Sequence, residues 1–505
     1  MRVSDGYQRL MYKSRLLLVV LLLLAFLTAQ SVVAADSPED VKVDWQKQER
    51  VSKTTISMQV VVMPPLRRGS PIHKQAFESL KDLKADCVRF VPWVPYPKLA
   101  VAVLEPPSNG KTSWNFSLID PLVVDFMEAS ENRPVIIDFS TIPAWMFKTE
   151  NPIAYESDPD KLVRGYGTQG TELRDPSGKE LGDYYARLLQ WYTKGGFTDE
   201  FGKRHTSNHR YKFDYWEVFN EPDIEHKMTP AQYAARYDAV VSAMKKVDPE
   251  MKFIGMSLAY PHKSPEFFEY FLNAKNHKPG IPLDMISYHF YAKASPDATF
   301  DSLQYSFFEQ AESFINTVRY IENIRQRLSP KTGTVINEVG SILPGVKPEN
   351  IPLEYWNLSG AVFAYVYTEL VRQGIEIVGE SQLLGFPTQF PSVSMLDWNT
   401  GKPNARYHVL KLLKDNFAPG DRIVATEPGR NTYVYAQGFV NRDGKRKMLL
   451  VNRRNRTIEV SLPEIKGANI TRIDQTTNYN APVTEKVMDE KLALGGFAVA
   501  VVTLP

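Results

Sequence analysis

The 505-residue sequence predicts an α/β fold, a (β/α)8 barrel followed by a C-terminal all-β module. Eight short, continuously apolar runs alternate with segments of helical periodicity, which is typical of a parallel sheet covered by helices. No glycine-rich phosphate-binding turn follows the first run, although a dinucleotide-binding open sheet would need one. After residue 417 the helical pattern stops, and short runs of alternating polarity replace it.

The predicted barrel strands are residues 56–63, 87–91, 135–139, 215–219, 253–257, 285–288, 334–336 and 375–378. The helix after the fourth strand has Thr229 as N-cap and Pro230 at its first position, which are favoured there. The helix after the seventh strand ends before Gly374, a favoured C-cap residue. A doubly wound open sheet is the alternative fold, but eight consecutive units favour closure into a barrel.

The region after residue 417 predicts a small β-sandwich. Its apolar runs are residues 432–440, 446–451, 457–462, 470–476 and 497–504. A turn signal, Asn441-Arg442-Asp443-Gly444, separates the first two runs. We therefore expect the barrel to cover residues 55–417 and the sandwich-like accessory domain to cover residues 418–505.

The N-terminus has the pattern of an export signal. Basic residues precede an almost unbroken aliphatic run at 16–27, and small residues follow at 32–35. The run is shorter than the roughly 20 apolar residues that span a membrane, which favours a cleaved signal peptide over residues 1–35. An uncleaved signal anchor is the alternative. Either interpretation predicts a secreted or periplasmic protein.

Composition and missing motifs exclude several classes of function. The net charge is only +2, so nothing indicates a nucleic-acid partner or a membrane-surface partner. The single cysteine, Cys87, cannot form a disulfide within the chain and is interpreted as a core residue. We find no clustered Cys and His residues, no phosphate-binding loop and no G-x-S-x-G turn. We therefore expect neither a metal nor another cofactor, and the sequence does not predict an oligomeric state.

Candidate catalytic residues occur at the C-terminal ends of the predicted strands, where barrel enzymes carry their active sites. Glu221 follows the fourth strand and Glu338 follows the seventh, so the two side chains would face each other across the barrel mouth. Retaining glycoside cleavage needs two carboxyl groups roughly 5–5.5 Å apart. Other polar and aromatic residues at these ends are Arg89, Trp93, Asp138, Trp145, Asn220, His289, Tyr291 and Glu380.

The segment 216–223, with the sequence WEVFNEPD, resembles the Asn-Glu-Pro signature of clan A glycoside hydrolases. The segment 335–338, VINE, looks like the nucleophile strand of that clan. Residues 229–256 look most like glycoside hydrolase family 39, which includes β-xylosidases and α-L-iduronidases. The resemblance covers about residues 55–505 and is strongest between 213 and 340.

The resemblance implies a retaining glycosidase with Glu221 as acid/base and Glu338 as nucleophile. It also implies that Arg89 and Tyr291 hydrogen-bond the nucleophile and that Asn220 contacts the sugar 2-hydroxyl. Three further residues are candidates for substrate binding: His289, Trp93 and Trp145. Each of these three could equally be a satisfied core residue.

One departure from the clan concerns strand eight. Many clan members place a Trp at the end of this strand, beneath the sugar, whereas residues 378–383 here read VGESQL. A platform from elsewhere, such as Trp398, or a polar subsite would replace it. Xylosides, uronic-acid glycosides and exopolysaccharides all remain compatible as the carbohydrate substrate. A catalytically inactive sugar-binding barrel and a transglycosylase are the alternative functions.

Overall fold

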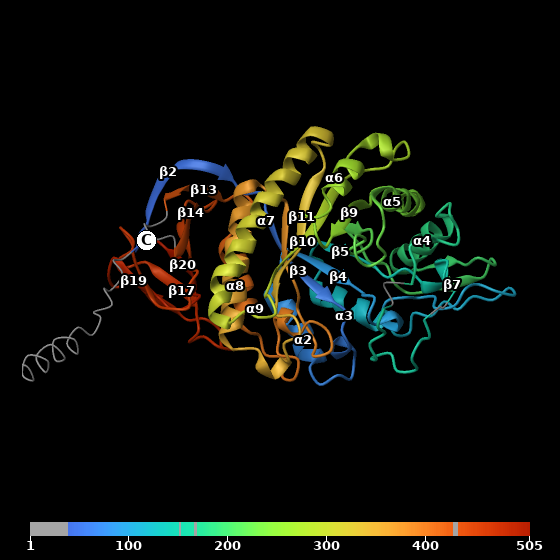
Figure 1. Cartoon of the computed structure of the whole chain (residues 1–505), viewed down its shortest axis with the longest axis horizontal. Coiled ribbons are helices and arrows are strands. Elements are labelled where there is room, and N and C mark those ends of the chain that lie inside the picture. Colours follow the sequence, from blue (N-terminus) through green and yellow to red (C-terminus); the bar gives the residue numbers. More distant parts are fainter. Residues whose placement is uncertain (1–38, 151–152, 166–168, 428–432) are drawn as a thin grey trace, which may run out of the picture.

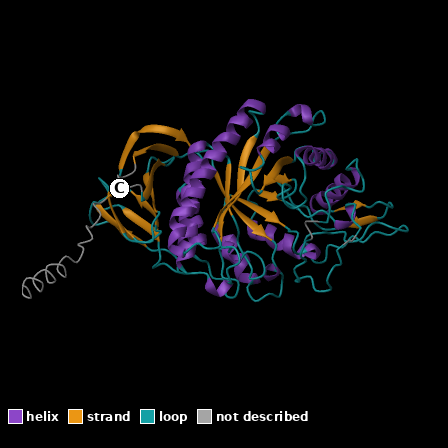
Figure 2. Cartoon of the chain, viewed as in Figure 1, coloured by secondary structure: helices purple, strands orange, loops and turns teal. Residues whose placement is uncertain are grey.

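The centre of the molecule is a closed barrel of eight parallel strands in the order β10-β11-β12-β3-β4-β5-β8-β9. The computed structural model describes residues 39–150, 153–165, 169–427 and 433–505. The expected signal peptide lies outside these residues. Figure 2 shows the strands gathered at the centre with helices around them. The predicted (β/α)8 barrel is confirmed.

Each barrel strand coincides with one of the eight predicted runs. Two strands, β10 and β11, continue well beyond their predicted ends. Polar residues such as His289 and Glu338 interrupt the apolar pattern there, so hydrophobicity alone ends these strands too early. The strands are β3 (Thr55–Val61), β4 (Cys87–Val91), β5 (Val135–Ile137), β8 (Tyr215–Glu217), β9 (Lys252–Leu258), β10 (Met285–Lys293), β11 (Gly333–Ile342) and β12 (Ile377–Glu380).

A helix follows every barrel strand and packs its apolar side on the barrel. The helices are α2 (His73–Leu83), α3 (Asp120–Ser130), α4 (Lys179–Lys194), α5 (Pro230–Met244), α6 (Pro265–Phe271), α7 (Phe300–Leu328), α8 (Glu354–Gln373) and α9 (Ala405–Asn416). The sequence analysis did not single out α6, whose seven residues are too few to show a clear helical period. Among the described residues, no helix combines the length and the apolar character needed to cross a membrane.

Local signals in the sequence fix helix ends as expected. The Thr229 hydroxyl accepts a hydrogen bond from the Gln232 backbone amide, and the Gln232 side chain accepts one from the Thr229 amide. Gly374 ends α8 with φ +78°, a conformation that costs little only for glycine. Cys87 is buried at the start of β4, and burial raises the pKa of its thiol to about 12. It is a core residue.

Beside the barrel lie two further sheets. The larger has seven strands in the order β18-β17-β20-β15-β14-β13-β2, and the smaller has the order β1-β16-β19. A short hairpin, β6 (Gly196–Thr198) and β7 (Arg204–Thr206), follows α4. The strands of the two sheets are β1 (Glu39–Asp40), β2 (Lys42–Val51), β13 (Arg422–Glu427), β14 (Val434–Val440), β15 (Arg446–Asn452), β16 (Ile458–Ser461), β17 (Asn469–Ile473), β18 (Thr484–Lys486), β19 (Lys491–Leu494) and β20 (Val499–Thr503).

The central strands of the seven-stranded sheet, such as β15 and β20, are buried on both faces. Along β15, Leu449 and Val451 belong to the barrel core, whereas Met448 and Leu450 belong to a second core shared with the small sheet. This alternation follows from the period of two in a strand, where neighbouring side chains point to opposite faces. The sheet therefore joins the barrel helices on one side and completes a sandwich on the other (Figure 1).

Residues 39–51 contribute two strands to these sheets, β1 and β2. The first pairs with β16 and the second pairs with β13, so the start of the described chain lies beside its C-terminal part (Figure 1). The side chains of β2 are largely exposed and polar, as suits the edge of a sheet. Val43 and Trp45 alternate with polar residues at its start and pack against the second core, but the remaining side chains are mostly charged or polar, so the sequence indicated only a polar stretch there.

Candidate active site

A cavity of about 1010 Å³ opens at the C-terminal ends of the barrel strands. This is the end at which barrel enzymes carry their chemistry. Six of the eight predicted site residues line it: Trp93, Asn220, Glu221, His289, Tyr291 and Glu338. Arg89 is fully buried beneath the cavity and contacts Glu338. The fold thus brings together residues that are up to 249 positions apart in the sequence.

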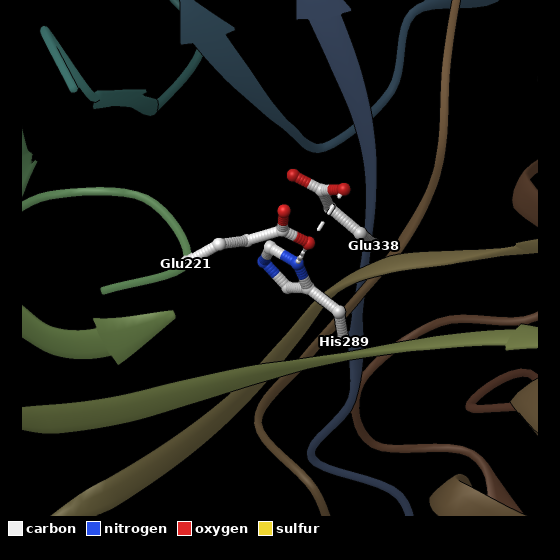
Figure 3. A group of neighbouring side chains, drawn as sticks. All are labelled: Glu221, His289 and Glu338. Atoms are coloured by element: carbon white, nitrogen blue, oxygen red, sulfur yellow. Dashed lines mark hydrogen bonds and ion pairs between the residues drawn. The ribbon is translucent and has the colours of Figure 1, made fainter. Parts of the chain in front are cut away.

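The carboxyl groups of Glu221 and Glu338 point toward each other, with His289 beside both (Figure 3). One oxygen of each carboxyl group and one ring nitrogen of His289 all lie within 4.8 Å of one another. Glu338 and His289 are register partners on the neighbouring strands β11 and β10. Glu221 reaches them from the turn after β8. This spacing suits two carboxyl groups that act on the same bond without an intervening water molecule.

The backbone that carries Glu221 adopts an unusual conformation. Phe219 and Glu221 have φ +68° and +45°, in the left-handed region that side chains other than glycine rarely adopt. Each such residue costs about 1–3 kcal/mol and persists only where its surroundings hold it. The Glu221 amide donates to the Ser257 carbonyl at 2.9 Å, which ties this turn to the end of β9. The position of the Glu221 side chain is therefore fixed by the neighbouring strand.

Three side chains hold Glu338. Gln59 donates to Oε1 at 2.5 Å, and Arg89 donates to the same oxygen at 2.7 Å. The Tyr291 hydroxyl donates to Oε2 at 2.7 Å and is itself 2.6 Å from the Ser381 hydroxyl. Because Tyr291 gives its proton to Glu338, Ser381 must donate to Tyr291. These contacts favour the ionised form of Glu338 and fix both of its oxygens.

Arg89 organises the floor of the site. Its guanidinium donates to Glu217 at 2.5 Å, to Asp138 at 2.7 Å and to Asn220 at 2.9 Å, besides Glu338. Burial by itself would lower the pKa of Arg89, but the surrounding carboxylates raise it. A guanidinium can serve these acceptors at once because its donors form a rigid planar fork, whereas an ammonium group cannot.

The two candidate carboxyl groups are shifted in opposite directions. Burial raises the pKa of Glu221, and the charge of Glu338 raises it further, while His289 opposes the shift. Burial would also raise the pKa of Glu338, but the charges of His289 and Arg89 and the Tyr291 hydrogen bond lower it below its ordinary value. Paired carboxyl groups whose environments separate their pKa values are typical of an acid and a nucleophile in one site.

His289 links the two carboxyl groups. Its Nδ1 lies 3.0 Å from Glu221 Oε1 and 3.5 Å from Glu338 Oε2, and its Nε2 lies 2.9 Å from the Ser257 hydroxyl. Burial would lower the pKa of His289, but Glu338 and Glu221 together raise it. The contact between Nδ1 and Glu221 Oε1 holds the Glu221 carboxyl group in place.

Among the described residues, Glu221, His289 and Glu338 form the one group whose atoms could converge on a metal ion. Both nitrogens of His289 already have hydrogen-bond partners, and the Arg89 guanidinium lies 2.7 Å from Glu338. A bound cation would have to break these contacts and compete with the positive charge of Arg89. The donor set therefore fits acid–base chemistry better than metal binding.

The model of the family described as Glycosyl hydrolases family 39 matches residues 196–339. This range contains both carboxyl groups, His289 and Tyr291. The protein is a glycosidase, and this region is similar to family 39. The resemblance stated from the sequence is confirmed, and so is the prediction of a glycosidase. No curated protein matches the chain in sequence.

Solved structures with a similar fold are also glycosidases. A GH51 arabinofuranosidase from Xanthomonas axonopodis pv. citri has 13% identity and a TM-score of 0.60, over 93% of this chain and 100% of that one. A glucosidase from Croceicoccus marinus has 15% identity and a TM-score of 0.57, over 93% and 99%. A GH30 endoxylanase from Clostridium papyrosolvens C71 has 13% identity and a TM-score of 0.55, over 92% and 99%. At these identities the likeness shows the barrel fold that the hydrolase shares with them.

Trp93 lies in the cavity of the hydrolase, but Trp145 does not. The Trp145 indole donates to the Val103 carbonyl at 2.8 Å, and the Arg174 guanidinium lies 4.3 Å from the centre of its ring. These contacts occupy Trp145 outside the site, so the structure gives it no place as a sugar platform. Glu380 is also buried away from the cavity, where it pairs with Arg406 at 3.0 Å. Burial raises the pKa of Glu380 to about 8 against the effect of that pair.

The end of strand eight presents no Trp to the cavity. Gln382 and Phe390 line it instead, and the Phe390 ring stacks on Trp93 with ring centres 5.9 Å apart. Trp398, the alternative platform considered from the sequence, does not line the cavity. Phe390 belongs to the loop after β12, and only the tertiary structure places it beside the end of β4.

Sequence reasoning missed two further residues of the hydrolase site. Gln59 on β3 contacts Glu338, and its long amide side chain in a largely apolar strand was the available signal. Glu225 follows Glu221 by four positions and had no such signal. Its Oε1 accepts from the Trp93 indole at 2.8 Å and from the Asn220 amide at 3.0 Å. It thereby fixes the orientation of two residues that line the cavity.

Proposed function

We propose that this protein is a retaining glycoside hydrolase in which Glu338 is the nucleophile and Glu221 is the acid and then the base. The observation that carries the proposal is the pair of facing carboxyl groups with opposite pKa shifts. An inverting enzyme would need its carboxyl groups roughly 6.5–9.5 Å apart to admit a water molecule between them and the sugar.

In the first step the ionised Glu338 attacks the anomeric carbon, and Glu221 gives its proton to the departing oxygen. Arg89 and Tyr291 hold Glu338 ionised and oriented before the attack. The strained turn and His289 hold Glu221 on the other side of the bond. The free hydrolase is therefore arranged for attack before the sugar binds, which lowers the cost of reaching the transition state.

In the second step a water molecule releases the sugar from Glu338. Once Glu338 is an ester, its negative charge no longer raises the pKa of Glu221. Glu221 then favours its ionised form and takes a proton from the attacking water. The same carboxyl group can thus act first as acid and then as base, because the charge of its neighbour changes between the steps.

Azide distinguishes the two roles. With an activated aryl glycoside, Glu338→Ala should abolish hydrolysis, and azide should give the inverted glycosyl azide. Glu221→Ala should still form the glycosyl-enzyme, because a good leaving group needs no proton, and azide should give the retained product. Glu250→Ala removes an exposed carboxylate outside the cavity and is the control. Exchanged behaviours would reverse the roles, and full activity in both variants would refute the site.

A panel of aryl glycosides should identify the sugar that the hydrolase cleaves. Arabinofuranosides, xylosides and glucosides come first, because the proteins of similar fold are described as arabinofuranosidases, endoxylanases and a glucosidase. Analysis of products in the presence of a sugar acceptor separates hydrolysis from transglycosylation. A chain that binds sugars but cleaves none of them would indicate an inactive sugar-binding barrel.

We propose that the hydrolase acts outside the cytoplasm, as a secreted or periplasmic protein. The proposal rests on the basic and aliphatic pattern of residues 1–35. Expression of the full chain in a secreting host, followed by N-terminal sequencing of the exported protein, tests it. A new N-terminus near residue 36 is expected, and retention of the full chain in the cytoplasm would contradict the proposal.

A further inference from the structure

The charges that line the cavity are strongly one-sided outside the catalytic pair. Arg164, Lys263, Lys293 and Lys347 line it, and all four are exposed. Among the described residues of the lining, the acidic ones are Glu221 and Glu338 alone. The whole chain has 60 basic and 58 acidic residues, so a random sample of its surface would contain both signs in similar numbers. Outside the catalytic pair, the cavity lining therefore carries an excess of positive charge.

Three of these cations lie at or after the C-terminal ends of three neighbouring strands. Lys263 follows β9, Lys293 ends β10 and Lys347 follows β11, and β10 pairs with both of the other strands. The same strands carry Ser257, His289 and Glu338. The lysines therefore form one wall of the cavity, on segments that continue from the strands bearing these three residues. Arg164 comes from the loop after β5 and adds a fourth cation to the lining.

The four cations are not neutralised by the protein. In the part of the chain that the structure describes, none of them lies within 4.0 Å of a carboxylate, whereas many other surface lysines and arginines do. The Lys263 ammonium lies 4.7 Å from the centre of the Tyr260 ring, which keeps its charge at the cavity. A cleft lined by charge of one sign concentrates ligands of the opposite sign.

The same cavity offers apolar surface suited to sugar rings. Tyr260 and Phe390 are 38% and 43% exposed, although large apolar side chains are usually buried. Both line the cavity, and Phe390 stacks on Trp93. The volume of about 1010 Å³ is at the upper end of the roughly 300–1,000 Å³ typical of pockets for small molecules. The cavity therefore has room for more than the sugar that reacts.

We propose that this cavity takes an anionic polysaccharide, whose carboxylate or sulfate groups lie against Lys263, Lys293 and Lys347 along this wall. The proposal rests on the proposed glycosidase function and names its substrate class. The rings of the chain stack on the exposed aromatic residues, and the lysines bind the acidic groups of sugars next to the reacting one. A neutral glycan would leave the lysine wall without a role in binding.

Binding is tested with the full-length Glu338→Gln protein, which cannot cleave its ligand. The probes are polygalacturonate and alginate as carboxylated chains, dextran sulfate as a sulfated chain, and xylan and dextran as neutral chains. Tight binding to the carboxylated or the sulfated class is expected at about 0.01 M salt, with a loss of at least tenfold at about 1 M salt, where charges are screened beyond about 3 Å. The class that binds more tightly identifies the anionic group.

A triple variant, Lys263→Gln with Lys293→Gln and Lys347→Gln, locates the effect. This variant should bind the anionic chain at least about tenfold more weakly, because it lacks three of the positive charges that attract anions into the cleft. The matched control is Lys275→Gln with Lys331→Gln and Lys466→Gln, which removes three exposed charges outside the cavity. The control should bind as tightly as the parent protein. Equal losses in both triples would show general attraction to a cationic surface and would overturn the proposal.

Failure of this proposal is distinguishable from failure of the proposed function. The wild-type protein and both triple variants are also assayed on the neutral aryl glycoside identified by the panel, which occupies only the reacting position. If the lysine triple retains this activity and neutral chains bind as tightly as anionic ones, the substrate class is wrong and the glycosidase stands. If Glu338→Gln leaves the aryl glycoside activity intact, the proposed site itself is wrong.

Discussion

At the scale of single residues, the hydroxyl of Tyr291 favours the ionised form of the proposed nucleophile. It donates to Glu338 and thereby lowers the pKa of that carboxyl group. The proposed nucleophile works only when ionised, so a lowered pKa extends activity toward acid pH. Tyr291→Phe should raise the pKa of Glu338 and move the acid limb of the kcat/KM profile to higher pH.

The control for this variant is Tyr288→Phe on the same strand. Tyr288 is buried, and its hydroxyl has no hydrogen-bond partner among the described residues, so losing it should leave the pH profile unchanged. Measurement of kcat/KM across pH with an aryl glycoside compares the two. An acid limb that stays in place in Tyr291→Phe would show that this hydrogen bond does not control the ionisation of Glu338.

A second residue-scale prediction concerns Glu225, which accepts hydrogen bonds from Trp93 and Asn220. Burial and the charge of Glu221 raise the pKa of Glu225 well above its ordinary value, which favours its neutral form. Glu225→Gln should keep near wild-type activity, because an amide oxygen accepts the same two bonds. Glu225→Ala leaves the buried Asn220 amide without an acceptor, at a cost of about 1–3 kcal/mol, and frees the half-buried Trp93 indole. Its kcat/KM should fall about tenfold or more.

Thermal unfolding of both Glu225 variants separates positioning from folding. If Glu225→Ala loses activity at a temperature where it is fully folded and Glu225→Gln does not, the residue acts by orienting Asn220 and Trp93. A Glu225→Gln variant as inactive as Glu225→Ala would show that the carboxyl group is needed for more than its acceptor oxygen.

At the scale of elements, the close packing of α4 on α5 depends on Gly182. A Cβ atom at this position would lie 2.6 Å from the Ala239 carbonyl oxygen, which belongs to the backbone of α5 and cannot move independently. Gly182→Ala should therefore force the helices apart at a cost of about 1–3 kcal/mol, as overpacking does elsewhere. Calorimetry should show a lower Tm with an unchanged kcat, since neither helix carries a proposed catalytic residue.

The control is Lys194→Ala, which removes an exposed side chain at the end of the same helix. It should leave the Tm nearly unchanged. A Gly182→Ala protein as stable as the wild type would mean that the two helices can separate without loss, contrary to the close contact between them.

At the scale of the whole molecule, the sandwich is part of the packing of the barrel. Leu449 and Val451 on β15 belong to the barrel core, and β2 pairs with β13. Deletion of residues 418–505 should expose the apolar surfaces of α8 and α9 and leave β2 without its neighbour. The free energy of unfolding of the shortened chain should fall by several kcal/mol, which lowers Tm by roughly 2–4 °C per kcal/mol. Alternatively, the shortened chain should aggregate.

Every proposed catalytic group lies before residue 418, so any folded fraction of the shortened chain should cleave the same aryl glycoside with the same stereochemistry. Differential scanning calorimetry and product analysis measure the two effects. A stable, soluble shortened chain would contradict the structural role of the sandwich, and a changed product would contradict the assignment of the chemistry to the barrel.

By itself, the sequence determined the repeated strand–helix pattern, several helix ends and the two principal carboxyl groups. These are local: apolar runs fix the strands, Thr229 and Gly374 fix helix ends, and Asn220-Glu221-Pro222 stands in one short segment after a strand. The position of Glu338 on the seventh of eight units followed from counting those units. Features that depend on a few neighbouring residues can be predicted from a single sequence.

Only the tertiary structure decided the contacts between distant segments. It placed Gln59 on Glu338, Glu225 between Trp93 and Asn220, and Phe390 on Trp93, and it left Trp145 outside the cavity. It also recruited residues 39–51 into the sheets, where backbone pairing with β13 and β16 does not require an apolar pattern. Such contacts depend on how loops from different strands meet in space, and that is set by the closure of the barrel and not by any local run of residues.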